Sequence, residues 1–160
     1  FTPDSAQRTL TRMAYELYEK HYDSDILVLA GIKNNGYYLA ELLAEELKQI
    51  SPLTIQLVSV DIDKKNPQTE SVIWGVPVSE LANSSVVLID DVSNSGSTLF
   101  YSMLPWMKQK VKSLKTAVLV DRAHKRFPTS PDFIGLSLAT TLQDHVEVVI
   151  QNKQVEAYLR

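Results

Sequence analysis

The most informative part of the chain is residues 85–99, which read Ser85-Val86-Val87-Leu88-Ile89-Asp90-Asp91-Val92-Ser93-Asn94-Ser95-Gly96-Ser97-Thr98-Leu99. The stretch opens with an apolar run that is too short for a helix and typical of a buried strand over 86–89. Two adjacent carboxylates follow, and then a loop of small hydroxyl residues with one glycine. Ligands of an open parallel sheet bind at the carboxyl ends of its strands, so we expect Asp90 and Asp91 to lie at a binding site.

The residue types of this loop suit a pentose 5-phosphate. Carboxylates accept hydrogen bonds from vicinal ribose hydroxyls, and serine and threonine hydroxyls donate to a phosphate. Gly96 lets the backbone approach a ligand closely with a positive φ angle. A helix predicted over 98–111 would aim its first N–H groups at the anion. The candidate ligand-binding residues are Asp90, Asp91, Ser93, Asn94, Ser95, Gly96, Ser97 and Thr98.

A pair of acids at a strand end is by itself a weak signal. Phospho-acceptor and metal sites in other doubly wound folds also place acids there, so the pair alone leaves a generic strand end equally open. The Ser-Asn-Ser-Gly-Ser-Thr run that follows the pair favours phosphoribosyl binding over that alternative.

Outward from this stretch, helix-like and strand-like segments alternate, which predicts a layered α/β architecture. Apolar residues spaced three and four apart predict helices over 4–22 and 37–50. Short apolar runs predict the other strands, and polar runs predict loops over 61–71 and 128–135. The remaining predicted strands are 25–30, 53–60, 72–74, 115–121 and 146–150, with a short tail ending at Arg160. No repeat or linker interrupts the pattern, so we expect one domain over 1–160.

Composition narrows the function classes. The 160 residues are 44% hydrophobic and 22% charged, which is ordinary for a soluble globular domain. The net charge of −3 argues against a protein whose overall positive charge attracts nucleic acid. The lack of cysteine excludes disulfides, thiolate metal sites and a cysteine nucleophile. Apolar runs fall well short of the ~20 residues that span a bilayer, so we expect a cytoplasmic protein without a membrane partner.

The 85–99 stretch resembles the signature of the type I phosphoribosyltransferases, in which an apolar strand, two acids and a Thr/Ser-Gly-x-Thr loop follow one another. In that family the acids hold the ribose hydroxyls and the loop holds the 5-phosphate. The resemblance implies a central, mostly parallel sheet flanked by helices, with a small hood region. It also implies transfer of the phosphoribosyl group of phosphoribosyl pyrophosphate to a nucleobase, with Mg²⁺ accompanying the diphosphate.

Further stretches resemble one subfamily, the pyrimidine operon attenuation regulator, which doubles as a uracil phosphoribosyltransferase. They are Gly31-Ile32-Lys33-Asn34-Asn35-Gly36-Tyr37-Tyr38-Leu39-Ala40, Ala117-Val118-Leu119-Val120-Asp121-Arg122-Ala123-His124-Lys125-Arg126-Phe127-Pro128 and Pro131-Asp132-Phe133-Ile134-Gly135. By resemblance the first is the pyrophosphate loop, with Lys33, Asn34, Asn35 and Gly36 as binding residues. Its N–H groups could cradle a diphosphate, with Lys33 adding charge. Without the resemblance, a plain strand–helix turn is the favoured interpretation.

The resemblance also suggests how the base and the reaction centre are formed. Asp121 and Arg122 would lie near the nucleobase, and Thr140 and Thr141 would close over it from the far side. Lys64 would act with Asp90 and Asp91 in catalysis, from a loop that closes over the site; the alternative is a solvated loop tip. Purine enzymes of the family usually carry an aspartate at the position of Asn94, so the asparagine favours a pyrimidine, and uracil is expected.

Two other functions compete with an active enzyme. A regulator would bind RNA, but the negative net charge of the chain disfavours RNA binding. The basic residues that could contact RNA are few: Arg8, Arg12, Lys108, Lys110, Lys112 and Lys115. A catalytically silent paralogue is the other alternative, because the subfamily has Thr-Arg where this chain has Asn34-Asn35. The subfamily resemblance further implies a homodimer or a larger assembly.

Overall fold

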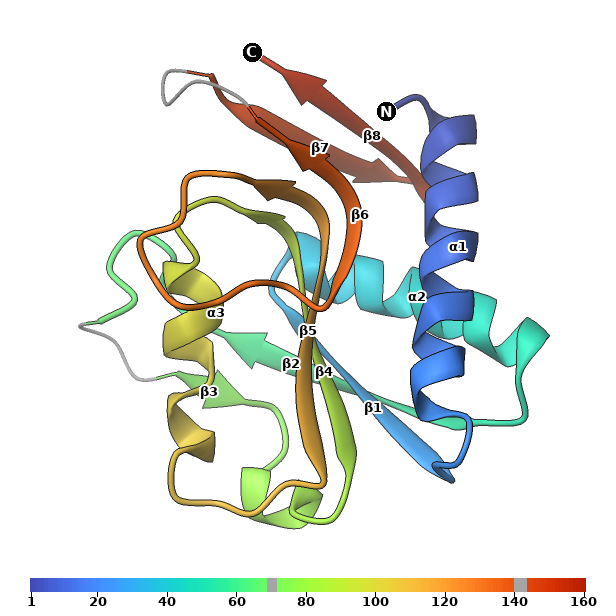
Figure 1. The fold of residues 1–160 in the computed structure, drawn as a ribbon, viewed down its shortest axis with the longest axis vertical. Helices are drawn as coiled ribbons and strands as arrows, with labels where there is room; N and C mark the ends of the chain where they lie inside the picture. The colour runs from blue at the N-terminus through green and yellow to red at the C-terminus, as the bar shows by residue number, and fades with distance from the viewer. Residues whose placement is uncertain (69–71, 140–143) are drawn as a thin grey trace.

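The computed structural model describes residues 1–68, 72–139 and 144–160. Its centre is a six-stranded sheet of order β3-β2-β1-β4-β5-β6 (Figure 1). The strands are β1 (Ile26–Ile32), β2 (Thr54–Asp61), β3 (Ile73–Trp74), β4 (Ser85–Ser93), β5 (Ser113–Arg122) and β6 (Phe133–Leu138). All neighbours pair in parallel except β3, which runs antiparallel to β2. The mostly parallel sheet predicted from the sequence is confirmed.

Two long helices cover one face of this sheet. They are α1 (Pro3–His21) and α2 (Asn35–Ile50), seen beside β1 in Figure 1. Thr2 caps α1 in a capping box with Ser5, which fixes where the helix begins. Leu10, Met13 and Leu17 of α1 are buried with the inner face of α2 in one core. The predicted helices over 4–22 and 37–50 are therefore present, with bounds shifted by one or two residues.

The opposite face carries shorter elements. They are η1 (Val78–Leu81), α3 (Ser97–Ser102) and η2 (Leu104–Trp106). Trp74 and Trp106 meet edge to face there, with ring centroids 5.5 Å apart, within a second apolar core. Because both faces are covered, β4 is buried from Ser85 to Asp90, and its residues 86–89 form a continuous apolar run.

A separate antiparallel hairpin, β7 (Val146–Gln151) with β8 (Gln154–Leu159), forms the small hood. Its two-residue turn holds Asn152 and Lys153 at φ 52° and 63°, the primed geometry that matches strand twist. Phe1 exchanges backbone hydrogen bonds with Ala157, so the N-terminus lies beside β8 (Figure 1).

Three predicted elements were wrong. The helix over 98–111 ends at Ser102, because Pro105 cannot donate the next helical hydrogen bond and clashes with the turn before it. The 128–135 loop ends early, because Phe133 already pairs with Ala117 as the start of β6. The tail before Arg160 contains β8, which pairs with β7 through the turn at Asn152 and Lys153.

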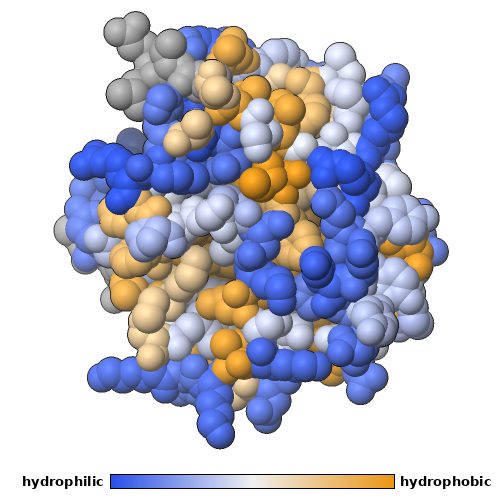
Figure 2. Space-filling model, viewed as in Figure 1, coloured by the Kyte–Doolittle hydropathy of each residue, from blue (hydrophilic) through white to orange (hydrophobic). Residues whose placement is uncertain are grey.

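The face of the molecule shown in Figure 1 presents hydrophilic residues interspersed with smaller hydrophobic areas (Figure 2). Among the described residues, every helix is too short or too polar to span a bilayer.

Candidate functional site

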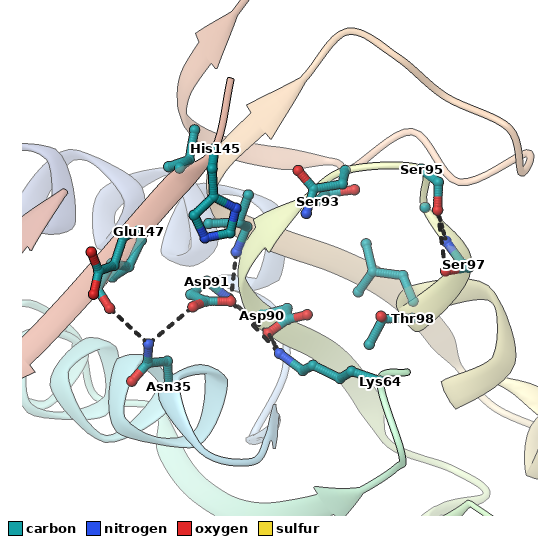
Figure 3. A pocket seen from close by; sticks show the side chains of 16 residues that line it. Asn35, Lys64, Asp90, Asp91, Ser93, Ser95, Ser97, Thr98, His145 and Glu147 are labelled. Carbon is teal, nitrogen blue, oxygen red and sulfur yellow. Dashed lines mark hydrogen bonds and ion pairs between the residues drawn. The ribbon is translucent and has the colours of Figure 1, made fainter. Parts of the chain in front are cut away.

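A pocket of about 480 Å³ opens where β4 ends, between the loop that follows this strand and the hood strand β7 (Figure 3). The carboxyl end of β4 supplies its floor, α2 and Lys64 one side, and β7 the other. The lining residues are Asn35, Lys64, Asp90, Asp91, Val92, Ser93, Asn94, Ser95, Gly96, Ser97, Thr98, Leu99, His145, Val146, Glu147 and Val148. The eight ligand-binding candidates predicted between Asp90 and Thr98 all belong to this lining.

Asp90 is a buried acid that faces one cation. Its side chain is 2% exposed, and its Oδ1 accepts hydrogen bonds from Lys64 Nζ at 2.8 Å and from the Asp91 N–H at 2.9 Å. Burial raises the pKa of Asp90 to about 7, against the opposing effect of the Lys64 ammonium and with the help of Asp91. Lys64, which the family resemblance predicts in a loop that closes over the site, therefore contacts Asp90 and Asp91, the predicted catalytic acids, in this structure.

Lys64 is held by both acids. Its Nζ lies 2.8 Å from Asp90 Oδ1 and 3.7 Å from Asp91 Oδ1. Burial of Lys64 opposes its charge, but the two carboxylates outweigh that effect and raise the pKa of the Lys64 ammonium. A ribose whose hydroxyls bind these carboxylates competes with the lysine for the same oxygen atoms.

Asp91 is oriented by its backbone and by Asn35. Its Oδ1 accepts from the Val92 N–H at 2.7 Å, and its Oδ2 accepts from Asn35 Nδ2 at 3.0 Å. The same Asn35 amide donates to the carbonyl oxygen of Val148 at 3.0 Å (Figure 3). Asn35 thus connects the start of α2 to an acid at the end of β4 and to the hood.

The loop of residues 93–98 turns sharply at Gly96, which has φ 91°. Ser95 Oγ donates to Ser97 Oγ at 3.1 Å and accepts from the Ser97 N–H at 3.3 Å. Helix α3, which begins at Ser97, has only six residues, so its dipole contributes less than the predicted long helix would. The groups that this loop offers to the predicted phosphate are therefore its own N–H groups and hydroxyls.

The structure places the four residues predicted for the pyrophosphate loop in different surroundings. Lys33 Nζ faces Asp61 at 3.9 Å, and Asn34 is the residue before α2. Gly36 packs against the end of β4, where an added Cβ would lie 2.5 Å from the Ile89 carbonyl oxygen. Of these candidates, only Asn35 is part of the pocket lining among the described residues.

The residues predicted to bind the base lie behind the loop. Arg122 is 7% exposed and donates to Asn94 Oδ1 at 3.2 Å, while Asp121 pairs with Lys125 at 2.5 Å. Both belong to the end of β5, next to β4, rather than to the pocket lining described above. Thr140 and Thr141 fall outside the described residues, so their predicted role stays a prediction.

Sequence reasoning missed the hood side of the pocket. Glu147 and Val148 line it from β7, and His145 lines it from just before that strand (Figure 3). In the sequence, no motif marks these three residues. It also missed Lys125, which lay in a basic turn and contacts the loop in the structure. Only the placement of β7 and of the 122–129 segment against β4 reveals these residues.

Comparison with known proteins assigns the family. The model of the phosphoribosyl transferase domain matches residues 4–153. This chain is a member of the phosphoribosyltransferase family. The Bifunctional protein PyrR of Streptococcus thermophilus is 33% identical over 150 residues, covering 90% of this chain and 84% of that protein. The Bifunctional protein PyrR of Bacillus subtilis is 34% identical over 166 residues, covering 95% of this chain and 91% of that protein.

Solved structures share the same fold at low identity. The hypoxanthine phosphoribosyltransferase of Trypanosoma cruzi superposes with a TM-score of 0.79 at 15% identity, covering 98% of this chain and 93% of that one. A hypoxanthine-guanine phosphoribosyltransferase of Bacillus anthracis superposes with a TM-score of 0.69 at 13% identity, covering 87% and 80%. The type I phosphoribosyltransferase fold predicted from the 85–99 stretch is confirmed.

Proposed function

We propose that this phosphoribosyltransferase moves the phosphoribosyl group of phosphoribosyl pyrophosphate to uracil and releases pyrophosphate. The observation that carries the proposal is the pair Asp90 and Asp91 on the floor of a pocket whose wall is the hydroxyl-rich loop 93–98. The acids suit the ribose hydroxyls, and the loop suits the 5-phosphate. Both needs of a phosphoribosyl ligand are met at one place.

The acids also suit the chemistry. Transfer breaks the bond between ribose C1 and the diphosphate oxygen and forms a bond to a base nitrogen. By family resemblance the transition state has oxocarbenium character, so positive charge develops on the ribose. Two carboxylates held beside the sugar favour that charge, because they are already oriented by Lys64 and Asn35 before substrate binds.

Lys64 has a proposed role in the same reaction. When ribose hydroxyls take over the oxygens of Asp90, its ammonium is released toward the pocket that it lines. We propose that it then donates to the leaving diphosphate, whose negative charge rises as the bond to C1 breaks. Lys33, Asn34, Asn35 and Gly36 remain predicted partners of the same diphosphate.

Mg²⁺ would enter with the diphosphate as part of the substrate. No group of three His, Asp or Glu side chains among residues 1–68, 72–139 and 144–160 could hold a metal ion. Mg²⁺ commonly binds through substrate phosphates and water, and there it neutralises charge on the diphosphate.

Uracil is proposed on two grounds. Asn94 offers no carboxylate that could accept a proton from a purine, and the relatives at 33–34% identity are named PyrR proteins. Asp121, Arg122, Thr140 and Thr141 are the proposed base-binding residues. Arg122 reaches the loop through Asn94, so base and phosphate binding would share one connection.

A transfer assay tests the proposal. Purified protein with Mg²⁺ and phosphoribosyl pyrophosphate should form uridine 5′-monophosphate from uracil and no product from hypoxanthine or guanine. An Asp91→Asn variant should lose most of the rate while still folding. Product from a purine alone would overturn the choice of base, and binding without turnover on any base would replace the enzyme with a silent paralogue.

A regulatory activity is the second candidate, because the relatives are named bifunctional. The subfamily resemblance makes RNA the partner to test, through basic residues such as Lys108, Lys110 and Lys112. RNA retention that weakens steeply with salt would support this role, and no retention at low ionic strength would remove it. The homodimer, the cytoplasmic location and the single domain over 1–160 remain predictions.

A further inference from the structure

Four successive carbonyl groups of the loop 93–98 accept hydrogen bonds from one neighbouring segment. Lys125 Nζ donates to the carbonyl oxygens of Ser93 at 3.2 Å and Asn94 at 3.0 Å. The Ser95 oxygen accepts from the N–H groups of residues 126 and 127 at 2.9 and 3.1 Å. Thr129 Oγ1 donates to the Gly96 oxygen at 2.9 Å. We refer to residues 122–129 as the brace.

These contacts fix which way the loop amides face. In a planar trans peptide, the carbonyl of one residue and the N–H of the next point in opposite directions. When the carbonyls of residues 93–96 face the brace, the N–H groups of residues 94–97 face away from it, and that of Ser97 meets Ser95 Oγ at 3.3 Å. The same loop residues line the pocket on their other side. Successive N–H groups on one side of a loop form an anion-binding concavity.

Lys125 is fixed from several directions. Besides the two loop carbonyls, its Nζ contacts Ser93 Oγ at 2.9 Å, the Arg122 carbonyl at 2.9 Å and Asp121 Oδ1 at 2.5 Å. Its side chain is 24% exposed. The ammonium therefore links the end of β4 to the end of β5, where the two strands separate and the loop begins.

Thr129 holds the turn of the loop. It is 7% exposed, and its hydroxyl reaches the Gly96 carbonyl because position 96 has no side chain. A Cβ built at Gly96 would lie 2.1 Å from Thr129 Oγ1, which is far inside contact distance. The glycine thus serves both the φ of 91° and the approach of the threonine.

We propose that Lys125 and Thr129 are positioning residues that hold the loop 93–98 with its N–H groups toward the substrate's 5-phosphate. The proposal rests on the proposed function, since the phosphate is that of phosphoribosyl pyrophosphate. Phosphate contacts persist unchanged from bound substrate to transition state, so loss of the brace should weaken binding more than it slows the chemical step.

The test compares Thr129→Val, which removes only the hydroxyl, with Thr129→Ser, which keeps it, and with Lys125→Met. For Thr129→Val and Lys125→Met, the KM for phosphoribosyl pyrophosphate should rise about tenfold or more while kcat changes less than about threefold. Thr129→Ser should stay near the wild type. Thr54→Val, at an exposed threonine that begins β2, is the matched control. A fall in kcat with KM unchanged, or equal loss in Thr129→Ser, would overturn the proposal.

Hydrogen exchange of the ligand-free protein separates this proposal from the proposed function. The amides of residues 94–97 should exchange faster in Thr129→Val and Lys125→Met than in the wild type and in Thr54→Val. Unchanged exchange at these amides would contradict the brace even if the enzyme is active. If the wild type transfers to no base, the proposed function fails, and faster exchange in the two variants still supports the orienting role.

Discussion

At the residue scale, the site depends on a buried acid whose charge is costly. Asp90 is buried, and its burial raises its pKa to about 7 from an ordinary 3.8. Between these two pKa values, the folded protein therefore binds a proton on Asp90 that the unfolded chain releases. Lys64 partly offsets this cost by its ion pair at 2.8 Å. Near its pKa, a carboxyl group can either donate a hydrogen bond to a sugar hydroxyl or accept one from it.

Asp90→Asn should change how stability depends on pH. Because the folded-state pKa is raised, the stability that Asp90 contributes is present below pH 4 and is lost as the pH rises toward 7. The loss is at most about 1.4 kcal/mol per pH unit. Denaturant unfolding from pH 4 to 8 should show the wild type losing stability relative to Asp90→Asn, with the difference levelling off near pH 7. A constant difference across that range would contradict the raised pKa.

Lys64→Met should extend that loss to higher pH. The Lys64 ammonium lowers the pKa of Asp90, so its removal raises that pKa further. In a double-mutant cycle with Asp90→Asn, the stability difference should keep growing above pH 7 instead of levelling off. Lys65→Met, on the exposed neighbouring residue, is the control and should leave the profile unchanged. A profile that levels off at lower pH in Lys64→Met would count against the ion pair.

At the scale of elements, the end of β4 is the point where the others meet. Helix α2 reaches it through Gly36 and Asn35, the hood strand through Val148, and β5 through the brace. The strand–acid–loop order was predicted from residues 85–99 because a buried strand and a hydroxyl-rich turn are local signals. The length of α3 was not, because the apolar spacing continues beyond Ser102 although Pro105 cannot be accommodated inside a helix.

The substitution Gly36→Ala should push the start of α2 away from the end of β4. Its Cβ would lie 2.5 Å from the Ile89 carbonyl oxygen and 3.0 Å from Asp90 Cα, and both are backbone atoms that cannot rotate away. Overpacking of this kind costs about 1–3 kcal/mol. Thermal unfolding should show a lower Tm, and the KM for phosphoribosyl pyrophosphate should rise because Asp90 moves. Ala40→Gly, in the same helix, serves as a comparison that destabilises without displacing Asp90. A Gly36→Ala protein with unchanged Tm and KM would refute this packing role.

At the scale of the whole molecule, the sequence predicted the layered, mostly parallel sheet, but only part of the pocket. Asp90, Asp91 and the loop are contiguous, so a single stretch was enough to find them. His145 and Glu147 reach the pocket only because the β7–β8 hairpin folds back over β4, and such long-range placement leaves no periodic trace in a strand. Lys125 was visible as a charge, but its five acceptors come from residues up to 32 positions away.

A crystal structure of the protein with ribose 5-phosphate tests the central claim most directly. The account predicts the phosphate against the N–H groups of residues 94–97, with the ribose hydroxyls within hydrogen-bond distance of Asp90 and Asp91 and Lys64 moved off Asp90. A pocket left empty at saturating ligand, or a sugar phosphate bound elsewhere while Lys64 keeps its ion pair, would contradict it.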